Sequence, residues 1–310
     1  MRLAHPTKLA HGTDPTGRRG PVAGVGAHPE RCATLQPMGE EQARRELLEL
    51  AVELGGEAAA LLMAGVDRVR ESIDTKSTGT DMVTEMDRAS ERLLVDGILA
   101  SRPEDGVLGE EGTDRTGSSG VRWVLDPLDG TTNYLYGHAG FAVSIGVLVD
   151  GRSVAAVVHD PLQRDVFTAT LGGGAHRNGR PVHVSDERDL GHTLVATGFS
   201  YVPERRRRQA QVVEELIPRI RDIRRMGAAA VDLCSVACGR VDAYYERGLH
   251  PWDHAAGALI AREAGAVVGH LDGGPEDDDF ILAAPPALWE PLQAVLTSVG
   301  AAEPWPDAPG

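Results

Sequence analysis

Asp126 and Asp129 stand three residues apart in the stretch DPLDG, directly after an apolar run that ends at Leu125. Two acids at such a turn can face one cavity, and the carbonyl oxygen of Leu128 between them adds an uncharged ligand. Magnesium prefers oxygen ligands and is commonly held by one or two carboxylates together with substrate phosphate. The spacing therefore suits a divalent cation at the end of a buried strand.

The segment that follows, Gly130-Thr131-Thr132-Asn133, could open a helix. The first N–H groups of a helix have no partner within the helix and point at whatever lies before it, which favours an anion. A pair of carboxylates that can bind metal ions, next to a helix N-terminus that can bind phosphate, is what metal-assisted phosphoryl transfer requires.

Other acids occupy comparable places in the chain. GEEG (109–112) follows the apolar pair Val107 and Leu108, and WDHAAG (252–257) follows the predicted strand DAYYE. Each also has a structural explanation, since GEEG and DPLDG are plausible turns. Asp253 is a good N-cap for the helix after it, and Asp87 could be the third residue of a capping box in TEMD. Taken together, they supply what a hard cation needs.

Helical patterns precede these acids. Leu47, Ala51, Leu54, Ala58 and Leu61 recur at steps of three and four, which predicts a helix from Glu40 onward. A second helix is predicted to start near Thr84 and to run past Ile98.

From Val121 the pattern changes to strands. Asp150-Gly151 and the RNGR segment at 177–180 are two-residue hairpin signals, so we expect an antiparallel meander. The GGG run at 172–174 lacks a following Lys-Ser/Thr, which favours a hairpin over a phosphate loop.

After residue 190, helices and strands alternate. Helices are predicted around 204–217, 228–238, from Asp253, and 287–299, with strands at 241–246 and 280–285. Such alternation indicates an α/β second lobe. The run RRRR (205–208) is most simply a solvated helix start.

The predicted organisation is therefore a disordered extension at 1–37, an α+β lobe at 38–190, an α/β lobe at 191–300 carrying Asp253 and the substrate contacts, and a loose tail at 301–310. Translation could equally start at Met1 or Met38.

The composition limits the partners. The 310 residues carry a formal net charge of -15, which argues against a nucleic-acid or anionic-membrane surface. Three cysteines form no paired framework and indicate a reducing cytoplasm, and Cys234 and Cys238 are expected to be small core residues. No run approaches the ~18 apolar residues of a membrane span, and the N-terminus lacks the apolar core of a signal peptide.

The set GEE, DPLDGTTNY and GLHPWDHAAG resembles the inositol monophosphatase family, within the wider group of lithium-sensitive, magnesium-dependent sugar phosphatases. The resemblance runs from about Glu40 to Ala294. It implies a layered α-β-α-β-α sandwich, two or three Mg²⁺ per active site, a small phosphorylated polyol or sugar as substrate, and a homodimer.

The resemblance also implies roles for individual residues. Glu110 is similar to a metal-binding glutamate that helps to activate water, and Thr131 to the threonine that hydrogen-bonds this water. Asp87 is similar to the acid that orients the threonine. The remaining implied metal ligands are Asp126, the carbonyl of Leu128, Asp129 and Asp253.

For the substrate, the resemblance implies contacts from Asp129, from the N–H groups of Gly130 and Thr131, and from Gly227, Ala228, Ala229 and Glu246. Lys76, Glu111 and Arg247 match positions near the site. Two departures from the family pattern bear on the choice of substrate: Ala228 replaces a common Ser or Thr, and Arg247 places a cation beside Glu246.

The leading prediction is a magnesium-dependent phosphomonoesterase acting on inositol 1-phosphate or a close polyol phosphate. Alternatives within the same chemistry are fructose-1,6-bisphosphatase, histidinol-phosphatase and NADP phosphatase. An alternative of a different class is a regulator that works through protein contacts without catalysis.

Overall fold

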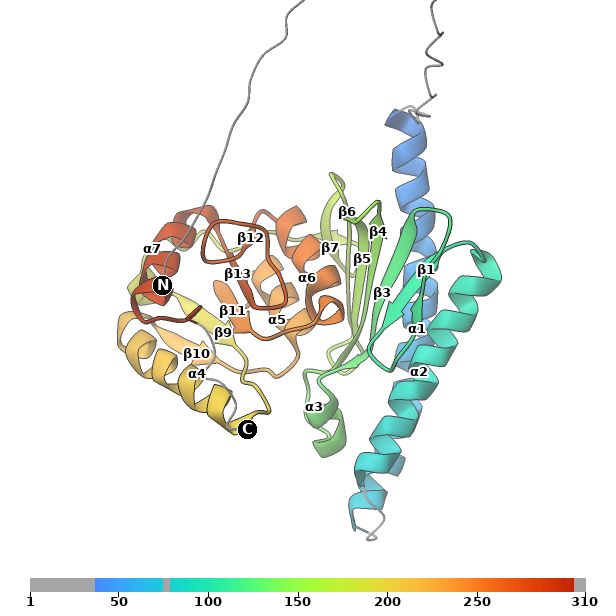
Figure 1. The fold of residues 1–310 in the computed structure, drawn as a ribbon, viewed down its shortest axis with the longest axis horizontal. Coiled ribbons are helices and arrows are strands. Elements are labelled where there is room, and N and C mark those ends of the chain that lie inside the picture. The colour runs from blue at the N-terminus through green and yellow to red at the C-terminus, as the bar shows by residue number, and fades with distance from the viewer. Residues whose placement is uncertain (1–36, 75–78, 304–310) are drawn as a thin grey trace, which may run out of the picture. The chain divides into compact units, whose positions relative to one another are not determined.

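Two helices cover one face of a large sheet in the computed structural model, which describes residues 37–74 and 79–303 (Figure 1). They are α1 (Pro37–Asp74) and α2 (Gly79–Ser101). The apolar face of α1 is buried as its periodicity predicts, except that Leu62 rather than Leu61 lies in the core. Both leucines fit a helical step, and only packing distinguishes them.

The predicted start of the second helix near Thr84 is wrong, because α2 begins at Gly79. TEMD therefore lies within the helix and does not cap it. A capping box begins a helix only where the preceding backbone is not helical, and no proline before Thr84 interrupts the helix there.

The large sheet has the strand order β2-β1-β3-β4-β5-β6-β7-β8. Its predicted antiparallel meander is confirmed from β3 to β8, with the turns at Asp150-Gly151 and Asn178-Gly179 and the glycine run all in hairpins. The strands are β1 (Gly106–Gly109), β2 (Asp114–Arg115), β3 (Val121–Asp129), β4 (Ala142–Val149), β5 (Arg152–Asp160), β6 (Asp165–Thr170), β7 (Gly174–Arg177) and β8 (Arg180–Pro181).

A second sheet of five strands has the order β10-β9-β11-β13-β12. The strands β9, β10 and β11 are parallel, whereas β12 and β13 are antiparallel to their neighbours. The strands are β9 (Leu194–Thr197), β10 (Asp222–Arg224), β11 (Ala243–Arg247), β12 (Val267–Gly269) and β13 (Phe280–Ala284).

The remaining helices complete the layers. α5 (Ala229–Ala237) and α6 (Pro251–Glu263) lie between the two sheets, where α6 packs on β3–β6 and α5 packs on β11 (Figure 1). α4 (Pro203–Leu216) and α7 (Pro286–Ser298) cover the outer face of the second sheet. The expected α-β-α-β-α sandwich is thus confirmed. Short helical turns are α3 (Thr131–Tyr136), η1 (Leu190–His192) and η2 (Ile217–Arg219).

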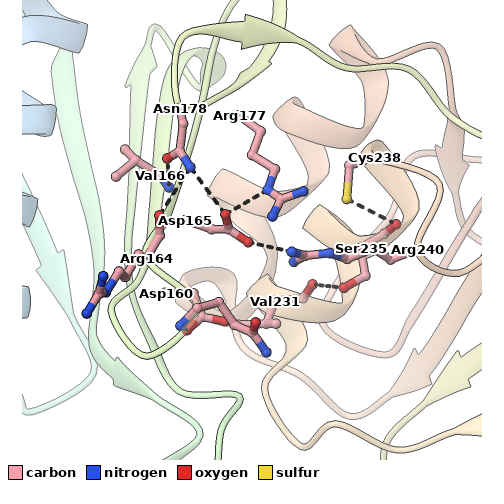
Figure 2. Close-up of polar contacts among 11 residues, drawn as sticks. Asp160, Arg164, Asp165, Val166, Arg177, Asn178, Val231, Ser235, Cys238 and Arg240 are labelled. Atoms are coloured by element: carbon pink, nitrogen blue, oxygen red, sulfur yellow. Dashed lines mark hydrogen bonds and ion pairs between the residues drawn. The ribbon is translucent and has the colours of Figure 1, made fainter.

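A buried carboxylate fastens the far hairpin of the large sheet to the segment after α5 (Figure 2). Asp165, 2 % exposed, accepts hydrogen bonds from Nε of Arg177 and Nη2 of Arg240, both at 2.7 Å. Asn178 donates to the same carboxylate at 3.3 Å. Despite the burial of Asp165, its bonds to these two guanidinium groups hold the pKa of its carboxyl below the ordinary range.

The ends of the chain test only part of the predicted organisation. The extension at 1–37 lies outside the described residues except for Pro37, which begins α1. Within the predicted tail at 301–310, Ala301 is 7 % exposed and Glu303 pairs with Arg208, and residues 304–310 lie outside the described part of the chain. The division into lobes between residues 190 and 191 remains a prediction. No helix in the described ranges is long and apolar enough to cross a membrane.

Candidate active site

A cavity of about 390 Å³ opens where loops of both sheets meet, and four of the predicted acids line it. Glu110, Asp126 and Asp129 come from the large sheet and its loops, and Asp253 comes from α6. Leu128 also lines the cavity, which includes Glu246 of β11. The structure therefore brings together residues separated by more than a hundred positions in the chain.

The end of β3 positions the first pair of acids. The register between β3 and β4 shifts between Asp126 and Asp129, which is where Pro127 removes a backbone donor. Asp126 accepts a hydrogen bond from the N–H of Leu128 at 3.0 Å. Gly130 then adopts the left-handed conformation (φ 84°) and ends the strand. Asp126 and Asp129 are left 2 % and 7 % exposed.

Glu110 lies beside this pair because β1 and β3 run parallel. Gly109 pairs with Leu125, and the N–H of Glu110 donates to the carbonyl of Leu125 at 3.2 Å. The GEEG turn is further fixed by Glu91, whose carboxylate accepts the N–H of Glu111 at 2.8 Å. Glu91 was not predicted, and its place within a helical run gives no local signal of this contact.

Asp253 faces the cavity from the first turn of α6, but it does not begin the helix as predicted. α6 begins at Pro251, and His250 is its N-cap. Proline is favoured in the first helical turn, and His250 and Asp253 form a reciprocal capping box. One oxygen of Asp253 accepts the N–H of His250 at 2.6 Å.

Burial raises the pKa of every acid in this group, and repulsion from a neighbouring carboxylate raises it further. The pKa of Glu110 is raised to about 6, and those of Asp126 and Asp129 are raised well above the ordinary range. The pKa of Asp253 is raised as well. A concentration of buried acids is electrostatically costly, and a bound cation would relieve this cost.

The donor set fits a hard cation such as Mg²⁺, since it consists of carboxylates and one carbonyl. Within the described residues, no three His, Cys, Asp or Glu side chains stand ready as a finished metal cage. Backbone N–H groups hold one oxygen each of Asp126, Asp129 and Asp253. In each of these three acids the second carboxylate oxygen takes no part in the bond to a backbone N–H.

Asp87 and Thr131 lie beside the acids without forming the expected contact. Asp87 on α2 is 3 % exposed, and its Oδ1 has no hydrogen-bond partner. Burial, followed by repulsion from Glu110, raises its pKa to about 8. The hydroxyl of Thr131 donates instead to the carbonyl of Leu128 at 3.2 Å.

The predicted substrate contacts line the same cavity. Gly227, Ala228 and Ala229 form the entry to α5, and the N–H of Ala230 donates to Asp129 at 2.7 Å. This bond holds the start of α5 against the end of β3.

Glu246 is half-buried on β11 and accepts the hydroxyl of Tyr244 at 2.8 Å. Burial raises its pKa to about 7. A Cβ at Gly198 would collide with this carboxylate, so the glycine makes room for it.

The three residues that match positions near the site differ in where they lie. Glu111 lies outside the cavity lining and pairs with Arg88 at 3.1 Å. Arg247 contributes to the lining, but its guanidinium bonds both oxygens of Asp279. Lys76 lies outside the described residues.

Sequence reasoning missed other residues around the cavity. Arg225, Arg205 and Tyr201 belong to its lining, and Tyr201 reaches Thr132 with a hydroxyl–hydroxyl distance of 3.2 Å. Asn133 donates to the carbonyls of Gly140 and Met226 at 2.6 and 2.7 Å. Only Asn133 had a local signal, because it belongs to the GTTN segment.

The fold and this acidic cavity define a member of the inositol monophosphatase family: residues 43–300 match that family, and the chain belongs to it. Among its relatives is an inositol-1-monophosphatase of Mycobacterium bovis, 43% identical over 282 residues, which cover 84% of this chain and 97% of the relative. Another, named Nus factor SuhB, from Escherichia coli K12, is 41% identical over 231 residues, covering 74% and 86%.

Solved structures agree with this placement. Mycobacterium tuberculosis SuhB superposes with a TM-score of 0.74 at 40% identity, covering 84% of this chain and 99% of that one. SaIMPase-II with bound inositol monophosphate gives a TM-score of 0.68 at 30% identity, covering 83% and 97%.

Proposed function

We propose that the chain is a Mg²⁺-dependent phosphomonoesterase that hydrolyses inositol 1-phosphate or a closely related polyol phosphate. The observation that carries this proposal is the convergence of Glu110, Asp126, Asp129 and Asp253 in one cavity that also contains Glu246. The first four provide oxygen ligands for cations, and the last provides an acceptor for hydroxyl groups.

The metal ligands in this proposal are Glu110, Asp126, the carbonyl of Leu128, Asp129 and Asp253, holding two or three Mg²⁺. When bound, Mg²⁺ would act as a Lewis acid toward the phosphate and supply the positive charge that the acids lack. In this proposal Glu110 and Thr131 hold the attacking water, which is supported by both residues lining the cavity together with Leu128. Asp87 contributes an unpartnered carboxyl oxygen next to Glu110.

The phosphate would rest on the N–H groups of Gly130 and Thr131, and the polyol on Gly227, Ala228 and Glu246. An ionised carboxylate can accept hydrogen bonds from two neighbouring hydroxyls, which suits a polyol ring. Of the neighbours Glu246 and Arg247, we assign substrate recognition to Glu246, because the guanidinium of Arg247 is held by Asp279.

A phosphate-release panel tests the proposal: inositol 1-phosphate, fructose 1,6-bisphosphate, histidinol phosphate and NADP, each with Mg²⁺ and with EDTA. We expect inositol 1-phosphate to be preferred and all activity to require Mg²⁺. Lithium in the submillimolar to millimolar range should inhibit, as the family resemblance implies. Turnover in EDTA, or a preference for another member of the panel, would contradict the corresponding part.

A second candidate is a regulatory role without catalysis, which the relatives named Nus factor favour. The full set of cavity acids speaks for catalysis, because a purely structural descendant would be free to lose them. Purified protein that releases no phosphate from any member of the panel would favour the regulator. The homodimer implied by the resemblance belongs to either candidate and is measurable by light scattering.

A further inference from the structure

Among the described residues, three arginines line the cavity, and they differ in what holds them. Arg247 is 6 % exposed and bonds both oxygens of Asp279. Arg205 belongs to the first turns of α4. The guanidinium of Arg225 makes no hydrogen bond or ion pair within the described part of the chain, although it borders a cavity with five acids.

The backbone around Arg225 is held firmly. The side-chain amide of Asn133 donates to the carbonyl of Met226 at 2.7 Å, which ties this segment to α3. Gly227 has a left-handed backbone (φ 89°), and Nη1 of Arg225 occupies the place that a Cβ at 227 would take. Glycine at 227 therefore allows the guanidinium to lie over the main chain at the entry to α5.

Two acids lie within electrostatic reach of this guanidinium. Burial raises the pKa of Glu246 and of Asp232, and the positive charge of Arg225 lowers both pKa values in part. Asp232 is 1 % exposed, and neither of its carboxyl oxygens has a hydrogen-bond partner. Arg225 thus offsets negative charge here without giving its N–H donors to either acid.

We propose that Arg225 forms a subsite for a second anionic group on the substrate, next to the hydroxyl-binding carboxylate of Glu246. The ligand class is a phosphorylated polyol that carries a further phosphate or carboxylate. This inference rests on the proposed function, in which the metal end of the cavity holds the phosphate to be cleaved.

The chemistry of the guanidinium supports this ligand class. Its planar fork of N–H donors matches the oxygens of phosphate and carboxylate, and such charge-assisted bonds are about twice as strong as neutral ones. Glu246 alone would repel a second anion, so a substrate of this class needs a cation beside that acid. The cavity volume of about 390 Å³ falls within the range of small-molecule pockets.

The test compares two substrates that differ only in the second phosphate: fructose 1-phosphate and fructose 1,6-bisphosphate. The measured quantity is the ratio of their kcat/KM values, bisphosphate over monophosphate. We expect Arg225→Gln to lower this ratio by about ten- to a hundredfold, and Arg225→Lys to lower it less. Arg224→Gln is the matched control, since Arg224 pairs with Asp222 outside the cavity lining and should leave the ratio unchanged.

An unchanged ratio in Arg225→Gln overturns the subsite. So does an equal fall for both substrates, which would assign Arg225 only to offsetting Glu246 and Asp232. If the protein hydrolyses neither fructose phosphate, the subsite is decided by calorimetry, and the proposed function is judged separately by phosphate release from inositol 1-phosphate. Wild-type protein and Arg225→Gln are then titrated with each sugar phosphate, and an unchanged ratio of the two Kd values overturns the subsite.

Discussion

Asp126 lies where both burial and neighbouring acids disfavour a negative charge. It is 2 % exposed, burial raises its pKa, and Glu110, Asp129 and Asp253 raise it further. In the proposed site Asp126 is a Mg²⁺ ligand, and an amide is a weaker ligand than a carboxylate. Asp126→Asn should therefore lower kcat by at least about 10²–10³, equivalent to losing ~3–4 kcal/mol. Initial rates at saturating Mg²⁺ and substrate measure this.

The matched control is Asp160→Asn. Asp160 is also 2 % exposed with a pKa raised by burial, but it lies outside this cavity. A similar loss of activity in both variants would mean that removing the charge of any buried acid lowers activity. That outcome would contradict a metal-binding role for Asp126. Melting temperatures of both variants separate misfolding from lost chemistry.

Glu246 gives the polyol end a pH dependence. Its pKa is raised to about 7, so the ionised form that accepts hydroxyls grows as pH rises through 7. We expect kcat/KM for inositol 1-phosphate to rise between pH 6 and pH 8. Glu246→Gln should lower kcat/KM at pH 8 by an amount equivalent to on the order of 1–3 kcal/mol, and it should remove the part of the pH dependence that Glu246 causes.

Tyr244→Phe is an informative companion to this variant. The Tyr244 hydroxyl donates to Glu246 and thereby lowers the pKa of that carboxyl. Its removal should move the rise in kcat/KM to higher pH. A profile identical in wild type, Glu246→Gln and Tyr244→Phe would contradict a role of this carboxylate in binding.

At this scale, strand alternation by itself predicts that neighbouring residues such as Glu246 and Arg247 point to opposite faces of the sheet. It could not show that Arg247 is buried against Asp279, which lies 32 residues further along the chain. Arg247→Ala is therefore expected to lower stability, because it leaves a bidentate ion pair without its cation, while it changes substrate choice little. Arg225 was missed for a related reason, since only tertiary structure places it beside Glu246.

At the scale of elements, the short helix α3 links the metal end of the cavity to the substrate end. Asn133 gives its amide to Gly140 and Met226, so one side chain joins the loop after α3 to the loop before α5. Asn133→Ala removes two bonds of about 0.5–1.5 kcal/mol each. We expect KM for inositol 1-phosphate to rise more than kcat falls, because Gly227 and Arg225 lose their anchor.

Asn178→Ala is the control for this prediction. Asn178 also donates its amide to a main-chain carbonyl, that of Arg164, but in the distant hairpin between β7 and β8 (Figure 2). It should lower the melting temperature without changing KM. Equal KM values in Asn133→Ala and wild type would show that the loop before α5 is positioned by other contacts.

The elements themselves followed from local patterns to different degrees. Hairpins such as the one at Asp150-Gly151 were predictable because two-residue turns have a strong local chemistry. The parallel pairing of β1 with β3 was not, since nothing in a four-residue strand specifies a partner across an intervening turn. The start of α6 at Pro251 was missed because Asp253 resembles an N-cap, whereas it serves as the third residue of a capping box.

At the scale of the whole molecule, the site depends on two sheets that meet across α5 and α6 (Figure 1). The large sheet supplies most cavity acids, and β11 of the second sheet supplies Glu246. Only the family resemblance predicts that the two sheets meet. Periodicity alone predicts antiparallel strands in the first part of the chain and alternating helices and strands in the second. The chain also carries a net charge of -15, to which these clustered acids contribute.

Clustered acids make the stability of the metal-free protein depend on pH. The pKa values of Asp87 and Glu110 are raised to about 8 and 6, above those of an unfolded chain. Acids with raised pKa destabilise the folded state progressively as pH rises from their unfolded pKa to their folded pKa. The free energy of unfolding in EDTA should therefore fall between about pH 4 and pH 8.

Added Mg²⁺ should reverse this loss, and more strongly at pH 8 than at pH 6, because carboxylates must give up protons to bind a cation. At a hundredfold excess over Kd the gain is about 2.7 kcal/mol. Thermal melts with Mg²⁺ and with NaCl at matched ionic strength measure it, since salt also screens the repulsion of an acidic chain. Asp126→Asn should lose most of the Mg²⁺-specific increment. An increment that NaCl reproduces, or that is the same at both pH values, would place the stabilising effect of magnesium outside the acidic cavity.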